Sequence, residues 1–295
     1  MSTQTPTLPH PVKGLREIAG NYDILLCDVW GVIHNGREHF PAACDALVQY
    51  NTGENRHVIL ISNSPRPATD VVAQLDQLGV PRDAWAAFVT SGDATRAELN
   101  KRSPGPVWAI GPDRDATLYE GIDLIHVDGQ EDAGFICCTG LFDDETETPE
   151  DYRERLYPAA IRGTEMVCAN PDRIVQRGDK IIYCGGALAD LYRSMGGRVT
   201  MAGKPFAPIY NQAMKLTVPL MGRPADRARV LCIGDGVTTD VLGANRQKLD
   251  CLFIAKGIHG EAAHGPDGLI DPGLANALLQ AETAHARYAS LDLEW

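Results

Sequence analysis

Residues 24–36 read Ile-Leu-Leu-Cys-Asp-Val-Trp-Gly-Val-Ile-His-Asn-Gly and place a single acid at the end of an apolar run. The apolar residues 24–27 predict a buried strand, and Gly31 permits a tight turn soon after Asp28. A carboxylate at the end of a strand can act as a nucleophile or bind a metal ion, although an Asp here is more often only a cap or turn former. The meaning of Asp28 therefore depends on what the rest of the chain places beside it.

Apolar runs and helix-forming stretches alternate along most of the chain. Strands are predicted at residues 58–62, 88–90, 107–110, 135–138, 166–169, 181–184, 230–233 and 251–254. Helices are predicted at residues 12–20, 42–50, 68–78, 149–161, 239–247 and 273–288. This alternation is typical of an α/β protein with a mainly parallel, Rossmann-like sheet.

Residues between about 100 and 150 have a different texture, since their loops are rich in Asp, Glu, Gly and Pro. Such an interruption predicts a core in two pieces, residues 1–86 and 200–295. Between them, residues 87–199 are expected to form an inserted α/β cap domain. Closure of such a cap, or its loops, would select the substrate and exclude water.

The composition excludes several classes of partner. Lys and Arg number 27 against 39 Asp and Glu, and the net charge of −12 argues against general binding to nucleic acid or anionic lipid. No apolar run approaches the roughly 18 residues of a membrane span, and no signal peptide is visible. The eight cysteines form no CxxC pair, which favours reduced, buried thiols in a cytoplasmic protein. The oligomeric state stays open, a homo-oligomer included.

Two further polar segments are expected near the ends of strands. Ser62 and Asn63 close the second strand, where a hydroxyl and backbone N–H groups can hold phosphate oxygens. Lys204, between Gly203 and Pro205, precedes a predicted helix and can offer a positive charge to an anion. The alternatives are an N-cap for the next helix in the first case and an ordinary exposed lysine in the second.

The most specific segment is residues 230–240, Val-Leu-Cys-Ile-Gly-Asp-Gly-Val-Thr-Thr-Asp. Asp235 ends a strand and Asp240 follows five positions later, which suits Mg²⁺, since this ion favours a few carboxylates with water and phosphate. Open α/β sheets place their sites at the carboxyl ends of strands. Asp28, Ser62, Lys204 and this acidic pair, in that order, form a set for phosphoryl transfer with a nucleophile, a phosphate ligand, a neutralising cation and a Mg²⁺ site.

This order of segments resembles the haloacid dehalogenase superfamily and, within it, the NagD-like class IIA subfamily of nucleotide, sugar-phosphate and pyridoxal-phosphate phosphatases. The resemblance spans residues from about 15 to 270 and implies a Rossmann-like core with an inserted cap. The motifs that carry it are residues 28–32, 62–63, 203–205 and 234–240, with residues 90–95, 170–172 and 185–187 as further matches.

The resemblance implies a role for each catalytic candidate. Asp28 would attack phosphorus and form an aspartyl-phosphate, which water then hydrolyses. Ser62 and the backbone of Asn63 would hold the phosphoryl oxygens, and Lys204 would neutralise the developing charge. The implied function is that of a Mg²⁺-dependent phosphohydrolase acting on a small phosphorylated metabolite.

The resemblance also implies the metal ligands. Mg²⁺ would be bound by the Asp28 carboxylate, the backbone carbonyl of Trp30 and Asp235, while Asp240 would orient water molecules or Lys204. A phosphate approaching three carboxylates is repelled, and Mg²⁺ with Lys204 would offset that repulsion. Phosphate is therefore expected to bind poorly without a divalent cation.

Position 30 departs from the family's pattern, in which a second Asp, two residues after the nucleophile, protonates the leaving oxygen and later activates water. Trp30 can do neither, and such general acid–base help is worth about 10²–10⁴-fold. His34 could titrate near neutrality and transfer the proton, although a plain turn histidine is the simpler interpretation.

Several alternatives follow from Trp30. The enzyme could use substrates with good leaving groups, such as acyl phosphates or aryl esters, or recruit an acid from the cap or the substrate. The chain could instead be a non-hydrolytic phosphate-binding or regulatory protein with little turnover. Transfer of the phosphoryl group to an acceptor other than water is a further alternative.

Weaker candidates for substrate binding lie close to the motifs, namely Arg66, Asn170, Asp172, Gly185 and Gly186. Arg66 could reach a substrate phosphate or a cap carboxylate, or simply lie exposed at a helix start. Asn170 and Asp172 could face the site, or only provide good turn chemistry. The two glycines could let the backbone approach the substrate, or only open a helix.

Overall fold

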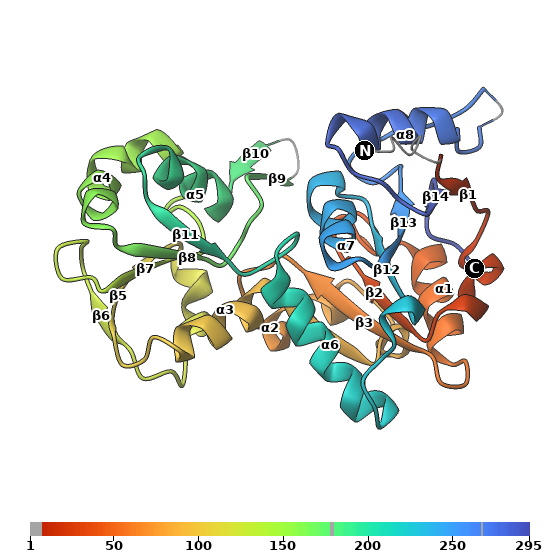
Figure 1. The fold of residues 1–295 in the computed structure, drawn as a ribbon, viewed down its shortest axis with the longest axis horizontal. Coiled ribbons are helices and arrows are strands. Elements are labelled where there is room, and N and C mark those ends of the chain that lie inside the picture. The colour runs from red at the N-terminus through yellow and green to blue at the C-terminus, as the bar shows by residue number, and fades with distance from the viewer. Residues whose placement is uncertain (1–7, 178–179, 267) are drawn as a thin grey trace, which may run out of the picture. The chain divides into compact units, whose positions relative to one another are not determined.

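The computed structural model describes residues 8–177, 180–266 and 268–295 (Figure 1). These residues fall into two compact units. The core unit comprises the described residues up to Ser62 together with Val72–Phe88 and Ala213–Trp295, and the insert unit comprises Asn63–Val71 and Val89–Gln212. The domain boundaries expected at residues 87 and 199 stay a prediction.

The core unit holds a seven-stranded sheet in the order β1-β14-β13-β12-β2-β3-β4. The pairings from β1 across to β3 are all parallel. The whole of β2 and of β12 is buried, as expected of a parallel sheet covered on both faces. The predicted α/β fold with a mainly parallel sheet is confirmed. The strands are β1 (His10–Pro11), β2 (Ile24–Cys27), β3 (His57–Ser62), β4 (Ala87–Thr90), β12 (Val230–Gly234), β13 (Asp250–Ile254) and β14 (Tyr288–Ser290).

The register of this sheet brings the ends of three strands to one edge. β2 lies between β12 and β3, with Cys27 opposite Ile233 in β12 and Leu60 in β3. Because the three strands run in the same direction, the residues that follow them meet at the carboxyl edge of the sheet. Asp28 and Asp235 are the first residues after β2 and β12.

Helices of the core unit pack their apolar faces toward this sheet. α1 begins with a proline, whose missing N–H would have no partner in the first helical turn, and it buries Leu47 and Tyr50. The hydroxyl of Tyr50 donates a hydrogen bond of 2.9 Å to the carbonyl of Tyr22. The helices are α1 (Pro41–Asn51), α7 (Leu242–Gln247) and α8 (Pro272–Ala281). The helices α2 (Ala68–Gln77) and α6 (Ala207–Met221), like the strand β4, contain residues of both units.

The insert unit is a second α/β body with its own five-stranded parallel sheet, in the order β11-β8-β7-β5-β6. A separate antiparallel pair joins β9 (Ile174–Arg177) to β10 (Lys180–Tyr183). The remaining elements are β5 (Pro106–Ile110), β6 (Ile125–Val127), β7 (Phe135–Cys138), β8 (Glu165–Cys168), β11 (Arg198–Met201), α3 (Ser91–Asn100), α4 (Arg153–Arg162) and α5 (Gly185–Ser194).

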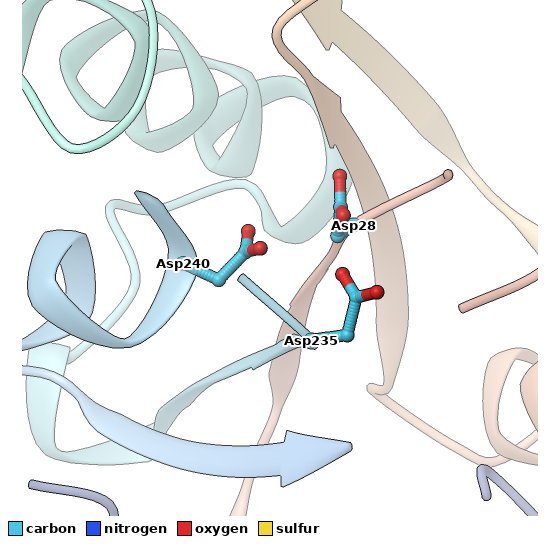
Figure 2. A group of neighbouring side chains, drawn as sticks. All are labelled: Asp28, Asp235 and Asp240. Atoms are coloured by element: carbon cyan, nitrogen blue, oxygen red, sulfur yellow. The ribbon is translucent and has the colours of Figure 1, made fainter. Parts of the chain in front are cut away.

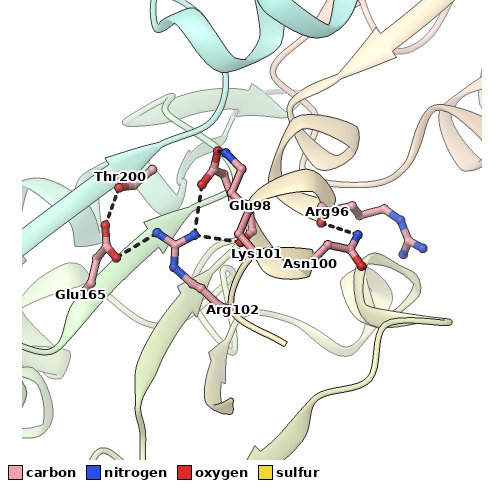
Figure 3. A network of polar contacts seen from close by, with 7 residues as sticks. All are labelled: Arg96, Glu98, Asn100, Lys101, Arg102, Glu165 and Thr200. Carbon is pink, nitrogen blue, oxygen red and sulfur yellow. Dashed lines mark hydrogen bonds and ion pairs between the residues drawn. The ribbon is translucent and has the colours of Figure 1, made fainter. Parts of the chain in front are cut away.

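A polar network ties the end of α3 to the insert sheet (Figure 3). Arg102 donates to Glu98 Oε2 at 3.0 Å and to Glu165 Oε2 at 2.8 Å. The hydroxyl of Thr200 donates to Glu165 Oε1 at 2.6 Å. Since Glu165 is the first residue of β8 and Thr200 lies in β11, the Glu165 carboxylate links Arg102 and the helix end to two neighbouring strands.

Four predicted helices differ from those in the structure. The helix predicted at 149–161 begins as a 3₁₀ turn, Pro149–Tyr152, before α4. The helix predicted at 273–288 ends at Ala281, because Thr283 has φ = +54°, a left-handed conformation through which a helix cannot continue. Residues 12–20 instead contain two 3₁₀ turns of three residues each, Leu15–Glu17 and Ala19–Asn21. The helix predicted at 239–247 begins as a π-helical turn, Val237–Val241, before α7. All the strands predicted from the sequence are present.

Two further observations concern the whole described chain. No helix among residues 8–177, 180–266 and 268–295 is both long enough and apolar enough to span a membrane. All eight cysteines are buried, and no disulfide joins any of them.

Candidate active site

Three carboxylates converge at the carboxyl edge of the core sheet, where Figure 2 shows them turned toward one another. Asp28 follows β2, Asp235 follows β12, and Asp240 lies on the π-helical turn that comes next. One oxygen of each lies within 4.8 Å of the other two, and the exposed fractions of the residues are 7%, 3% and 3%. Like charges at about 4 Å repel by roughly 1–4 kcal/mol per pair, so a cation would stabilise this cluster.

The chemistry of the three side chains fits a hard divalent cation. All of them offer carboxylate oxygens, the ligands that Mg²⁺ and Ca²⁺ prefer. Within the part of the chain that the structure describes, no other group of three His, Cys, Asp or Glu side chains brings its ligand atoms this close together. The fold thus gathers the three acids that the sequence singled out as metal ligands.

Backbone from two loops packs tightly against Asp235. Its Oδ2 accepts a hydrogen bond of 2.9 Å from the N–H of Ile258, in the loop after β13. Gly31 has φ = +82°, and a Cβ atom at that position would lie 2.1 Å from the same oxygen. Any side chain at position 31 would therefore push the carboxylate away. The loop at Gly257 and Ile258 was not predicted to contribute, although its position after a neighbouring strand of the same sheet was a usable signal.

Asp240 is held by its own turn. Its Oδ2 accepts hydrogen bonds from the N–H of Gly236 at 3.1 Å and from the hydroxyl of Thr239 at 3.3 Å. The N–H of Asp240 in turn donates to the carbonyl of Gly236 at 2.8 Å. These bonds fix the carboxylate close to the strand end that carries Asp235.

Trp30 lies in the loop directly after Asp28 and stays 37% exposed. Its ring packs edge-on against the ring of His34, with the centroids 5.2 Å apart. His34 is buried, and its Nδ1 accepts a hydrogen bond of 2.9 Å from the N–H of Gly36. Burial lowers the pKa of His34 to about 4. The expectation that His34 could titrate near neutrality is therefore wrong, because burial disfavours the charged imidazole.

The second motif lies where β3 ends. Ser62, the last residue of that strand, and Asn63 are both buried. The Asn63 carboxamide accepts a hydrogen bond of 2.7 Å from the N–H of Lys204 and donates one of 3.2 Å to the carbonyl of the same residue. It donates another, of 2.8 Å, to Asp172 Oδ1. Motifs that are far apart in the sequence thus meet at one side chain.

The third motif is equally buried. Lys204 follows β11 and is 2% exposed. The residue before it, Gly203, lies so close to its neighbours that a Cβ atom there would be 2.5 Å from Asn63 Oδ1 and 2.6 Å from Ser91 Oγ. Ser91 was not singled out as a candidate; its buried Oγ has no hydrogen-bond partner.

The weaker candidates form contacts within the insert unit. Asn170 Oδ1 accepts a hydrogen bond of 3.1 Å from the N–H of Asp172, whose carbonyl accepts one of 3.0 Å from Gly186. Carbonyl oxygens of residues 170 and 171 occupy the space where side chains at Gly185 and Gly186 would lie. The backbone of Arg66 is held by the hydroxyl of Thr90, at 2.7 Å. Binding of substrate by these five residues stays a prediction.

Comparison with family models supports the order of motifs. Residues 25–125 match a model described as haloacid dehalogenase-like hydrolase, and residues 201–276 match a second, HAD-hydrolase-like model. The first range contains Asp28, Ser62 and Asn63, and the second contains Lys204 and the acidic pair.

Known proteins resemble the chain over most of its length. A haloacid dehalogenase-like hydrolase from Brucella suis 1330 has a solved structure that is 41% identical, with a TM-score of 0.83 over 96% of this chain and 99% of that one. The 5′-nucleotidase YutF of Bacillus subtilis is 24% identical over 80% of this chain and 88% of its own. A glycerol phosphate phosphatase from Mycobacterium tuberculosis, solved in complex with calcium, is 25% identical, with a TM-score of 0.62, 81% of this chain and 68% of that one being covered.

The match to the Brucella structure is close and nearly complete in both directions. It confirms the resemblance that the motifs indicated, and the seven-stranded, mainly parallel sheet with acids at its carboxyl edge agrees with it. The chain belongs to the family of haloacid dehalogenase-like hydrolases.

Proposed function

We propose that this hydrolase is a Mg²⁺-dependent phosphatase that acts on a small phosphorylated metabolite through an aspartyl-phosphate at Asp28. The observation that carries the proposal is the convergence of three buried carboxylates where the strand before Asp28 ends. Relatives named as a 5′-nucleotidase and as a glycerol phosphate phosphatase support the class of substrate. The eight buried, unbridged cysteines favour a cytoplasmic location.

Asp28 and Asp235, with the backbone carbonyl of Trp30, would hold the metal ion, and Asp240 would orient the water molecules around it. When bound, Mg²⁺ supplies positive charge that offsets the carboxylates and attracts a phosphate group. The calcium-bound structure of a relative supports a divalent cation in this family.

The chain's own residues then perform the transfer. A carboxylate oxygen of Asp28 attacks phosphorus, and the bond from phosphorus to the leaving oxygen breaks, so that this oxygen departs with the electron pair. The Ser62 hydroxyl and the Asn63 N–H hold the phosphoryl oxygens, and Lys204 is assigned charge neutralisation by its place in the motif order. A water molecule next attacks phosphorus, which releases phosphate and restores the Asp28 carboxylate.

Trp30 limits which substrates react well. An indole cannot protonate the leaving oxygen or activate water, and His34 is neutral at pH 7 with its Nδ1 already engaged by Gly36. A group that departs without a proton, such as an aryl oxide or a carboxylate, therefore suits this site better than an alkoxide. An acid supplied by the insert unit or by the substrate would extend the range to alkyl esters.

A second candidate function rests on the same residue. A chain that kept its phosphate and metal groups but lost its acid could bind a phosphorylated ligand and turn it over little. Ligand-induced thermal stabilisation without phosphate release would favour this function. Appearance of a phosphorylated acceptor in place of free phosphate would instead favour phosphoryl transfer.

The test is phosphate release from p-nitrophenyl phosphate and from glycerol phosphate, each with Mg²⁺ and with a chelator. We expect release from the aryl ester that needs Mg²⁺, and slower release from the alkyl ester, because only the aryl oxide leaves readily without a proton. Absence of release from both esters and from a broad panel of phosphorylated metabolites would overturn the proposal.

A further inference from the structure

The polar atoms of the Asn63 side chain form hydrogen bonds with other residues of the chain. Both hydrogens of its amide group are donated, one to Asp172 Oδ1 at 2.8 Å and one to the carbonyl of Lys204 at 3.2 Å. Its Oδ1 accepts the N–H of Lys204 at 2.7 Å, and the residue is 6% exposed. The carboxamide therefore pairs with both polar backbone groups of Lys204, as a neighbouring strand would.

The residue before Lys204, Gly203, has no room for a side chain. A Cβ atom on Gly203 would lie 2.5 Å from Asn63 Oδ1, 2.6 Å from Ser91 Oγ and 2.8 Å from Pro171 Cδ. Three segments that are distant in the sequence thus enclose one Cα atom. The backbone that enters Lys204 is closely surrounded, and the backbone of Lys204 itself is held by two hydrogen bonds to Asn63.

Asp172 fixes Asn63 in turn. Its N–H is held by Asn170 Oδ1 at 3.1 Å and its carbonyl accepts the N–H of Gly186 at 3.0 Å, so both ends of the residue are restrained. From this position its carboxylate accepts the hydrogen bond from Asn63. Asn170, Asp172 and Gly186, which the sequence suggested for substrate binding, thus hold Asn63, and Asn63 holds the backbone of Lys204.

We propose that Asn63 is a positioning residue for Lys204 and that Asp172 acts through Asn63. The proposal rests on the proposed function, in which Lys204 supplies the charge that the transferring phosphoryl group requires. The backbone is the anchor point of the lysine side chain, so a shift of that backbone displaces the range of positions that the ammonium group can reach. A displacement of about 1 Å in such a group can cost up to about 100-fold in rate.

The chain offers a matched control in the core unit. Asn245 donates to the carbonyl of His285 at 2.7 Å, and its Oδ1 accepts the N–H of the same residue at 2.9 Å. This is the same double pairing of a carboxamide with one residue's backbone, without a lysine at its centre. Loss of the Asn245 pairing tests what the hydrogen bonds alone contribute to stability.

The first experiment is a kinetic cycle on p-nitrophenyl phosphate with Mg²⁺, using Asn63→Ala, Lys204→Ala and the double variant. We expect Asn63→Ala to lower kcat about 10–100-fold with little change in KM, and to cause no further loss when Lys204 is already absent. Asn245→Ala should leave kcat unchanged. The proposal would be overturned if the loss of kcat in the double variant equalled the product of the losses in the two single variants. It would also be overturned if Asn245→Ala lowered kcat as much as Asn63→Ala does.

Two variants of Asp172 test the second half of the proposal. Asp172→Asn keeps an oxygen that can accept from Asn63, whereas Asp172→Ala removes it. We expect Asp172→Asn to retain most of kcat and Asp172→Ala to resemble Asn63→Ala. Equal losses in the two variants would show that the hydrogen bond to Asn63 is not what matters.

A second measurement does not depend on turnover. The rate at which a small amine-reactive reagent modifies Lys204, followed by mass spectrometry, reports how firmly this 2% exposed side chain is held. We expect faster modification in Asn63→Ala and in Asp172→Ala, and the wild-type rate in Asn245→Ala. An unchanged rate of Lys204 modification in Asn63→Ala and Asp172→Ala would overturn the positioning role, even if the protein is an active phosphatase. Absence of phosphatase activity in the wild type would instead overturn the proposed function alone.

Discussion

The two parallel sheets of this molecule end in very different ways at their carboxyl edges. In the core sheet, β2 and β12 are followed by Asp28 and Asp235. In the insert sheet, β5, β7 and β8 are followed by Gly111, Thr139 and Ala169. Both edges are formed by short, buried, parallel strands, so the fold alone does not distinguish them. The residue that follows each strand distinguishes the two edges.

The polar side chains at the two carboxyl edges are arranged in different ways. The core edge keeps three buried carboxylates close together, an arrangement that is unfavourable without a cation. The insert edge uses its polar groups to hold backbone, as Asn170 does for Asp172. We infer that the core edge carries the chemistry and that the insert unit supports it by holding Lys204 through Asn63.

The largest expected effect comes from removing the acid at the end of β2. Asp28→Asn should lower phosphate release from p-nitrophenyl phosphate by at least about 10³-fold, because the amide cannot attack phosphorus and only binding and electrostatic help remain. Thr139→Val, at the corresponding position after β7 in the insert sheet, should change the rate less than about 3-fold. Similar losses in the two variants would break the distinction between the edges.

Adding an acid to the core edge should sharpen the distinction. Trp30→Asp introduces a carboxyl group where the family's general acid stands, and should raise the rate with glycerol phosphate by about 10-fold or more. The first formation of nitrophenol from p-nitrophenyl phosphate should change much less, because its leaving group needs no proton, whereas steady turnover of this ester should also rise, because the new carboxyl group can activate water. A folded variant with an unchanged or lower rate on glycerol phosphate would show that Trp30 is not merely a missing acid.

The smallest effect concerns the network that joins α3 to the insert sheet at Glu165, the first residue of β8 (Figure 3). Burial raises the pKa of Glu98 and of Glu165, but hydrogen bonds, from Lys101 and Arg102 to Glu98 and from Thr200 and Arg102 to Glu165, outweigh it and lower the pKa of each overall. A lowered pKa adds stability that is complete above about pH 4.5 and is lost as pH falls through the folded-state value.

Arg102→Met should therefore lower the free energy of unfolding by about 1–3 kcal/mol at pH 7 and weaken its decline below pH 4.5. Urea unfolding at pH 7 and at pH 4 measures both effects, and the phosphatase rate at pH 7 serves as the control, which should not change. If the free energy of unfolding falls by the same amount from pH 7 to pH 4 in the wild type and in Arg102→Met, that result would contradict this role.

The candidate site could be predicted from the sequence because its parts are local. An apolar run that ends in Asp predicts a strand end, and parallel neighbours bring such ends together, so Asp28, Asp235 and Asp240 were found without a structure. The same reasoning found every strand that has a continuous apolar run. It missed five strands of two to four residues that lack such a run, namely β1, β6, β9, β11 and β14.

The support of Lys204 could not be predicted, because it depends on contacts between distant segments. Asn63 and Lys204 are 141 positions apart. The hydrophobic pattern of a sequence does not predict which distant backbone groups a carboxamide side chain will bond to. Burial was equally hidden, and it lowers the pKa of His34 to about 4. Sequence patterns thus identify groups that can perform chemistry, while packing decides how those groups are held and which remain available.

The central claim is that Asp28 takes the phosphoryl group and that Trp30 leaves its hydrolysis slow. Rapid mixing of the enzyme with p-nitrophenyl phosphate and Mg²⁺, followed by acid quenching, tests both parts at once. We predict a burst of one nitrophenol per active site before steady turnover, with phosphate found on the Asp28 peptide by mass spectrometry. Nitrophenol and phosphate released in step from the first turnover, with Asp28 unmodified or another residue phosphorylated, would contradict the claim.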